Sequence, residues 1–143
     1  MTERPELFAA VVLQAAALDA LRREMSPKGA ANRPEFGSVA TVAGLRALLA
    51  MSTYAHILPG AAYPAVLLTH GVQDPRVDVW ESAKTAARLL AATSSGKPVL
   101  LRLDDDAGHG PGNTPQQQRD ERADIFSFLL WQMGMPGYRV PAP

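Results

Sequence analysis

Three short apolar segments constrain the fold of this chain more than any other feature of its sequence. They cover residues 8–13, 65–69 and 99–103, and each is predominantly apolar rather than alternating like a half-exposed strand. Strands of this kind are typical of parallel sheets, because helices cover both faces of such a sheet. Segments with helical patterns lie between them, so we predict an α/β fold with about three parallel strands and flanking helices.

The most regular helical pattern covers residues 78–93. Its apolar residues recur at helical spacing, and the expected buried face consists of Trp80, Ala83, Ala87 and Leu90. The charged residues of the same segment are expected to face water; they are Glu81, Lys84 and Arg88. Trp80, like Trp131 near the end of the chain, is therefore interpreted as a core residue rather than a binding platform.

The rest of the chain is expected to form one domain that spans residues 1–143. Its further elements are predicted to be helices over residues 42–51 and 115–133, a short helix or turn over residues 19–25, a loop over residues 26–38 and an irregular tail over residues 135–143. The last helix should bury an apolar stripe made of Ile125, Phe128 and Leu129.

The small number of strands has a consequence for assembly. A sheet has about five or six strands on average, and a strand buried on both faces needs neighbours on both sides. At least one edge of a three-stranded sheet is therefore expected to be exposed in the monomer. Such an edge presents unpaired backbone groups that pair readily with another chain, so we expect a homo-oligomer.

The charge balance argues against several classes of function. The chain has 14 basic and 14 acidic residues and a formal net charge of +0, which argues against binding to nucleic acids or membrane surfaces. No segment approaches the roughly 18 apolar residues of a membrane span. Residues 7–21 lack the basic lead and uninterrupted apolar centre of a signal peptide. There is no cysteine, which excludes disulfides and thiol catalysis, and the cytoplasm is the expected location.

Two side chains with catalytic potential follow two of the predicted strands. Asp74 comes shortly after the second apolar segment, and His109 follows the third between Gly108 and Gly110. An Asp followed by a His in chain order matches the last two members of a Ser-Asp-His hydrolase triad. Each also has a plainer explanation: Asp74 could close a turn or cap the next helix, and His109 could be a solvated loop residue.

Arg76 is the third candidate for the site, because its forked donors could hold a substrate carbonyl or carboxylate. Residues 104–106 are three consecutive aspartates, but a calcium loop alternates its ligands, so no metal site is expected. The glycines near His109 are not followed by the Lys and Ser or Thr of a phosphate loop, so no cofactor is expected. His56 and His70 have no partner at a recognisable spacing and receive no role.

Taken together, the motifs resemble the C-terminal part of the prolyl oligopeptidase family, serine peptidases whose catalytic domain has an α/β-hydrolase fold. The matching segments run in order along the chain and cover residues 3–8, 48–52, 63–68, 74–77, 97–102 and 107–112. The segments Asp74-Pro75-Arg76-Val77 and Ala107-Gly108-His109-Gly110 are the most specific. The resemblance implies that Asp74 and His109 are triad residues and that Arg76 contacts a substrate carbonyl.

Two departures from the family pattern qualify this resemblance. The family's nucleophile elbow would lie just before the segment at residues 3–8, and no Gly-x-Ser-x-Gly turn occurs in the chain. We therefore expect a truncated three-layer α/β-hydrolase-like domain. Asn32 stands where the family has the aromatic that stacks on proline, which puts proline specificity in doubt.

Two classes of function remain open. The chain could be a weak, promiscuous hydrolase in which the Asp74–His109 dyad acts on esters, small carbonyl compounds or short peptides. Water, a partner's hydroxyl or a local hydroxyl would then replace the elbow serine; the local candidates are Ser26, Ser38, Ser52, Ser94, Ser95 and Ser127. The same dyad could also move protons in imine exchange. Alternatively, the chain could be a non-catalytic remnant, or one half of a split or oligomeric serine hydrolase.

Overall fold

The computed structural model describes residues 1–27, 29–110 and 113–138. Within them, three strands form one parallel sheet in the order β1-β2-β3; they are β1 (Ala10–Gln14), β2 (Ala65–Gly71) and β3 (Val99–Asp104). In the register, Val66 pairs with both Val11 and Val99, so the central strand is flanked on both sides over most of its length. The α/β class and the parallel sheet predicted from the apolar segments are confirmed.

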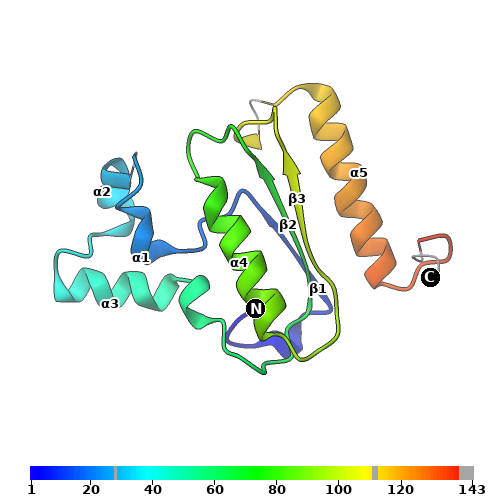
Figure 1. The fold of residues 1–143 in the computed structure, drawn as a ribbon, viewed down its shortest axis with the longest axis horizontal. Coiled ribbons are helices and arrows are strands. Elements are labelled where there is room, and N and C mark those ends of the chain that lie inside the picture. Colours follow the sequence, from blue (N-terminus) through cyan, green and yellow to red (C-terminus); the bar gives the residue numbers. More distant parts are fainter. Residues whose placement is uncertain (28, 111–112, 139–143) are drawn as a thin grey trace.

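Two long helices cover the two faces of this sheet and make three layers (Figure 1). The helix α4 (Val79–Ala92) lies on one face and α5 (Pro115–Gln132) on the other. The shorter elements lie in the first half of the chain; they are η1 (Pro5–Leu7), α1 (Ala20–Arg23), η2 (Gly29–Asn32), α2 (Arg33–Phe36), α3 (Val42–Met51) and η3 (Tyr54–His56). The first three α-helices lie beyond α4, on the side away from α5 (Figure 1).

Several helix boundaries have identifiable sequence causes. Thr41 caps α3, because its hydroxyl accepts a hydrogen bond from the Gly44 N–H. Thr114 and Gln117 form a reciprocal capping box at the start of α5, where Pro115 occupies the first turn. These two helices begin where the sequence predicts them. The prediction that residues 26–38 form a loop is wrong in part, since η2 and α2 fall inside that segment.

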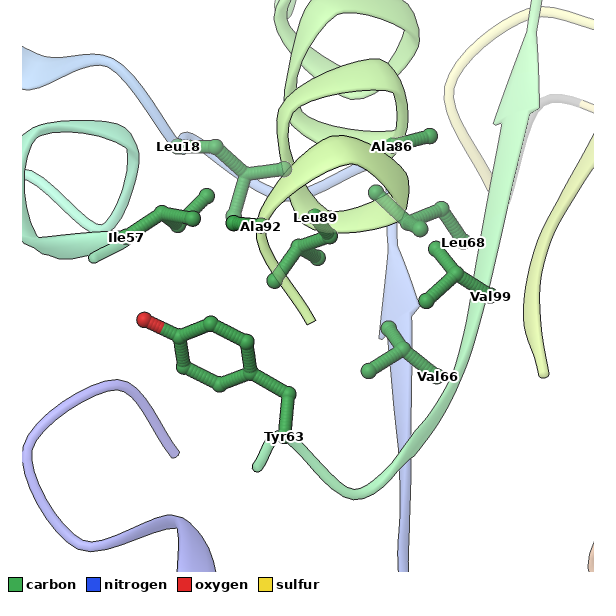
Figure 2. Close-up of a cluster of buried hydrophobic side chains, with 9 residues drawn as sticks. All are labelled: Leu18, Ile57, Tyr63, Val66, Leu68, Ala86, Leu89, Ala92 and Val99. Carbon is green, nitrogen blue, oxygen red and sulfur yellow. The ribbon is translucent and has the colours of Figure 1, made fainter. Parts of the chain in front are cut away.

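The main core lies between the sheet and α4 (Figure 2). Its buried residues come from β2, β3, α4, the loop after β1 and the loop before β2; they are Leu18, Ile57, Tyr63, Val66, Leu68, Ala86, Leu89, Ala92 and Val99. The Tyr63 hydroxyl accepts a hydrogen bond of 2.7 Å from the Leu58 N–H, so this large ring is buried with its polar atom satisfied.

The predicted orientation of α4 is wrong. The residues it buries are Glu81, Ser82, Thr85, Ala86, Leu89 and Ala92, whereas Leu90 is 59% exposed. The physical reason is that Glu81 has buried partners: its carboxylate accepts hydrogen bonds from the N–H groups of Leu18 and Asp19 at 2.7 and 2.9 Å. Arg23 lies 3.4 Å from the same carboxylate. A buried charge with this set of partners outweighs the apolar pattern that suggested the opposite face.

The other face of the sheet has a smaller core. Ala65, Leu67 and Phe128 are buried there, and Ile125, Leu129 and Trp131 pack against them, as expected for the stripe on α5. All seven residues of β2 are buried, but β3 buries only Val99 at its start. The prediction that all three strands are buried on both faces therefore holds for β2 alone, because β1 and β3 are edge strands in the described part of the chain.

No helix within the described ranges is both long enough and apolar enough to span a membrane. The predicted irregular tail at residues 135–143 lies partly outside the described residues.

Candidate active site

The site lies where β2 and β3 end at the same edge of the sheet. Gly71 and Asp104 are register partners at the ends of the two strands, so the loops that follow them start side by side. The Val72 N–H donates to the Asp104 carbonyl at 2.9 Å, and the Gln73 N–H donates to the Ala107 carbonyl at 3.0 Å. A side chain on Gly71 would overlap the backbone carbonyl of Gly108, so glycine allows this close approach. The loops carrying Asp74 and His109 are thus joined by their backbones.

Asp74 occupies a turn that uses both of its carboxylate oxygens. Oδ1 accepts hydrogen bonds from the N–H groups of Arg76 and Val77, at 2.7 and 3.0 Å. Oδ2 accepts a hydrogen bond of 2.7 Å from His109 Nδ1. The side chain is 0% exposed. The turn-closing role considered for Asp74 and its contact with the histidine therefore occur together. Asp78, rather than Asp74, stands at the start of α4.

The environment of Asp74 favours the ionised carboxylate. Burial raises the pKa of the Asp74 carboxyl, but the backbone N–H groups of Val77 and Arg76 and the side chain of His109 lower it by more. The net pKa lies below the ordinary value of 3.8. Asp74 is therefore a carboxylate near neutral pH and acts as a hydrogen-bond acceptor for the imidazole.

His109 is oriented by this contact. Because a carboxylate can only accept, Nδ1 carries the proton, and in the neutral ring Nε2 is left as the basic atom. The side chain is 27% exposed, and no described residue donates to or accepts from Nε2. The His109 loop also borders a cavity of about 260 Å³, whose other lining residues include Gln14, Thr69, Asn113 and Glu121. This is the arrangement that a general base requires.

Arg76 is joined to the site through its backbone. Its N–H group donates to Asp74, while its side chain is exposed and borders a separate hollow of about 180 Å³ with Ser26, Pro75 and Asp78. The structure therefore brings Asp74 and His109 together but leaves the Arg76 guanidinium in a neighbouring hollow. Its role towards a substrate stays a prediction.

None of the candidate hydroxyls, all within the described ranges, hydrogen-bonds to His109. Ser38 donates to Glu24, Ser94 donates to the Gly60 carbonyl, and Ser95 pairs with Thr93. Ser52 is fully buried, and Ser127 borders an apolar cavity beside α5. Ser26 lines the hollow that Asp74 also borders.

Two residues next to the dyad, His70 and Ser82, were given no role in the sequence analysis. His70 lies on β2 and is 2% exposed, and its Nε2 is 3.4 Å from Asp74 Oδ2. Its Nδ1 is 2.7 Å from the hydroxyl of Ser82, which lies on α4. His70 and Asp74 are four residues apart, a spacing that brings side chains together on a helix. The two residues are joined by a strand and a turn instead, so this spacing did not predict their contact.

The described residues include no group of three acidic or histidine side chains that could hold a metal ion. Of the three consecutive aspartates, Asp104 lies 3.9 Å from Arg102 and accepts a hydrogen bond from the Asp106 N–H.

A parallel sheet between two helical layers, with a carboxylate and a histidine joined at the ends of adjacent strands, defines an α/β-hydrolase-like arrangement. The comparisons with known proteins make this more specific. The model of the prolyl oligopeptidase family matches residues 1–136, and the chain belongs to this family.

The relatives give the extent of the match. The chain is 31% identical over 136 residues to a prolyl endopeptidase of Elizabethkingia meningoseptica, covering 94% of this chain and 19% of that protein. It is 40% identical over 78 residues to dipeptidyl aminopeptidase BI of Pseudoxanthomonas mexicana, covering 54% of this chain and 11% of that protein. The chain thus spans about a fifth or less of these relatives.

Solved structures agree on the fold. A structure from a study of two prolyl endopeptidases superposes with a TM-score of 0.89 at 32% identity, covering 94% of this chain and 20% of that one. Oligopeptidase B from Leishmania major superposes with a TM-score of 0.84 at 22% identity, covering 93% and 19%. The second likeness concerns the fold alone.

Proposed function

We propose that the chain carries a prolyl-oligopeptidase-like acid–base site in which His109 is the general base and Asp74 orients it. The observation that carries the proposal is the 2.7 Å contact between His109 Nδ1 and the buried Asp74 Oδ2. It leaves Nε2 to remove a proton from water or from a hydroxyl group and to return it to the leaving group.

The expected activity is weak and broad. General base catalysis contributes roughly 10²–10⁴-fold, and a hydrolase normally gains more from an activated nucleophile and an oxyanion hole. The preferred substrates are activated esters and small carbonyl compounds, and short peptides are expected to be hydrolysed poorly. Some relatives are called prolyl endopeptidases and another a dipeptidyl aminopeptidase, which supports acyl transfer as the reaction class.

A second candidate is a site completed by another polypeptide, either a second copy or a separate chain that carries the nucleophile. Two observations favour it. In the described part of the chain, β1 pairs only with β2, so its other edge is free. In addition, β3 exposes Leu100, Leu101 and Leu103. A free edge and exposed leucines together are features of a surface that another chain covers.

The test is hydrolysis of a panel of short p-nitrophenyl esters by the wild type and by two matched pairs of variants. His109→Ala and Asp74→Asn should each lower kcat/KM by roughly 10²-fold or more, because they remove the base or its orienting partner. His56→Ala and Asp78→Asn are the controls, since neither side chain hydrogen-bonds to Asp74 or His109 in the described structure.

Each outcome separates the candidates. Loss of turnover in the first pair alone supports the acid–base site. Equal rates in all five proteins contradict it. Absence of turnover, together with a monomer by size-exclusion chromatography with light scattering, contradicts both the hydrolase and the homo-oligomeric version of the second candidate. An oligomer without turnover favours the second candidate or a non-catalytic remnant.

A further inference from the structure

A second histidine approaches the same carboxylate oxygen that binds His109. His70 Nε2 lies 3.4 Å from Asp74 Oδ2, and the His70 and Asp74 side chains are both 0% exposed. Asp74 Oδ2 therefore has one imidazole at hydrogen-bond distance and another just beyond it. The second imidazole belongs to β2, the most completely buried strand of the sheet.

The contacts of His70 determine which of its nitrogens is protonated. Nε2 lies 2.9 Å from the Val77 carbonyl, which can only accept a hydrogen bond, so Nε2 must carry a proton. Nδ1 lies 2.7 Å from the Ser82 hydroxyl, which donates to it when the ring is neutral. His70 is therefore protonated on Nε2 and His109 on Nδ1, which are opposite tautomers around one carboxylate.

These contacts connect the Asp74 turn to the rigid part of the fold. The Val77 N–H donates to Asp74 Oδ1, while the Val77 carbonyl accepts from His70, so both backbone polar groups of Val77 are engaged. Ser82 is fully buried on α4 and fixes the other side of the ring. The ring thus joins β2, the turn and α4 at the point where Asp74 Oδ2 must be held.

We propose that His70 is a positioning residue for the dyad: its Nε2–H group holds the Val77 carbonyl and faces Asp74 Oδ2, so that this oxygen stays directed at His109. The catalytic consequence of this role rests on the proposed function, but the positioning of Asp74 by His70 does not. The alternative is that His70 only fills the core. In that case the Asp74–His109 contact would not depend on the Nε2–H group of His70.

The first test uses the wild-type protein and needs no activity. Long-range ¹H–¹⁵N NMR spectra assign the protonated nitrogen of each ring, with His56→Asn identifying the third histidine. The expected result is a proton on Nε2 of His70 and on Nδ1 of His109, the latter shifted downfield by its carboxylate partner. An unprotonated Nε2 on His70 would overturn the proposal.

The second test compares His70→Gln with His70→Asn, each of which keeps one of the two hydrogen-bonding positions of the ring. Glutamine places its amide near the position of Nε2, and asparagine places its amide near that of Nδ1. In His70→Asn the His109 Nδ1 proton should exchange with water about tenfold faster, which is the factor expected when one hydrogen bond near a charged group is lost. In His70→Gln the downfield signal should persist.

Equal exchange in both variants would contradict the positioning role, because a mere packing role does not distinguish the two amides. If His70→Asn does not fold, Ser82→Ala serves instead, since it keeps the ring and removes its anchor on α4. In Ser82→Ala, the His109 Nδ1 proton should exchange faster than in the wild type but more slowly than in a protein that lacks the Asp74–His109 contact. An exchange rate equal to that of the wild type would contradict the proposal.

Activity is measured separately on the ester panel. His70→Asn should lower kcat with little change in KM, because the dyad is misplaced while the cavity remains. If the wild type has no turnover, the proposed acid–base activity of this chain fails, but the NMR result still decides whether His70 holds Asp74.

Discussion

The two faces of the sheet differ in how completely they are packed, and the dyad lies at their boundary. On the α4 face, nine buried apolar residues form one cluster, and buried polar groups such as Glu81 have partners. On the α5 face, the buried apolar cluster consists of Ala65, Leu67 and Phe128, and an apolar cavity of about 540 Å³ remains between β3 and α5. Asp74 is tied to the packed face through His70 and Ser82, whereas His109 lies on the loop that leads to the open face.

This difference indicates that the two members of the dyad are held by unequal parts of the fold. A side chain on well-packed elements keeps its position, while a loop followed by a thinly packed helix has a smaller free energy of local opening. The carboxylate is therefore the fixed partner of the dyad, and the imidazole is the partner that depends on what covers the α5 face.

The largest expected difference between the faces comes from two glutamates. Glu81→Ala removes the acceptor for two backbone N–H groups and leaves Arg23 without its buried partner, so it should lower the free energy of unfolding by about 3–5 kcal/mol. Glu121→Ala on α5 removes one hydrogen bond to Thr69 and should cost about 1 kcal/mol. Urea unfolding followed by circular dichroism measures both, and equal losses would contradict the comparison.

A smaller difference is expected for apolar truncations. Leu89→Ala, at a position that is 0% exposed on α4, should lower the free energy of unfolding by about 2–5 kcal/mol. Leu129→Ala, on the partly buried stripe of α5, should lower it by roughly half as much, because this side chain buries less apolar surface and a neighbouring cavity already exists.

Leu90→Ala tests the orientation of α4. A loss of more than about 0.5 kcal/mol in the free energy of unfolding would contradict the exposed placement of Leu90.

The sequence was sufficient for the strands, for α3 and α5, and for placing Asp74 and His109 each on a loop that follows a strand. These features depend on local patterns: continuous apolar segments, apolar residues at helical spacing, and polar residues shortly after a strand. The face of α4 could not be predicted, because Glu81 is buried by partners more than 50 residues away in the chain. His70 was missed for the same reason, since its contact with Ser82 exists only once β2 and α4 have packed.

The exposure of β3 could not be predicted from its local sequence pattern either. The segment Leu100-Leu101-Arg102-Leu103 is as apolar as that of a central strand, but nothing in the described part of the chain pairs with its outer edge. Periodicity records the preference of a segment for burial, and only the topology decides whether there are residues to bury it.

The smallest expected effect tests whether the carboxylate belongs to the packed face. The pKa of Asp74 is lower in the folded protein than its ordinary value of 3.8, so ionised Asp74 stabilises the fold. This contribution is complete above the unfolded-state pKa and is lost as the pH falls through the lower pKa of the folded protein. We expect the wild type to exceed Asp74→Asn in free energy of unfolding by about 1 kcal/mol at pH 6, and the difference to shrink as the pH falls below 3.8 towards the lower pKa of the folded protein.

Urea unfolding at several pH values between 6 and 2.5 measures this difference, with Asp78→Asn as the control on the same loop. Asp78 makes no side-chain cap on α4, so its substitution should not reproduce the pH dependence. A difference between wild type and Asp74→Asn that is independent of pH would mean that the carboxylate is not held by Val77, Arg76 and His109 as described. In that case Asp74 would be as loosely fixed as the loop of His109, and the contrast between the two members of the dyad would no longer hold.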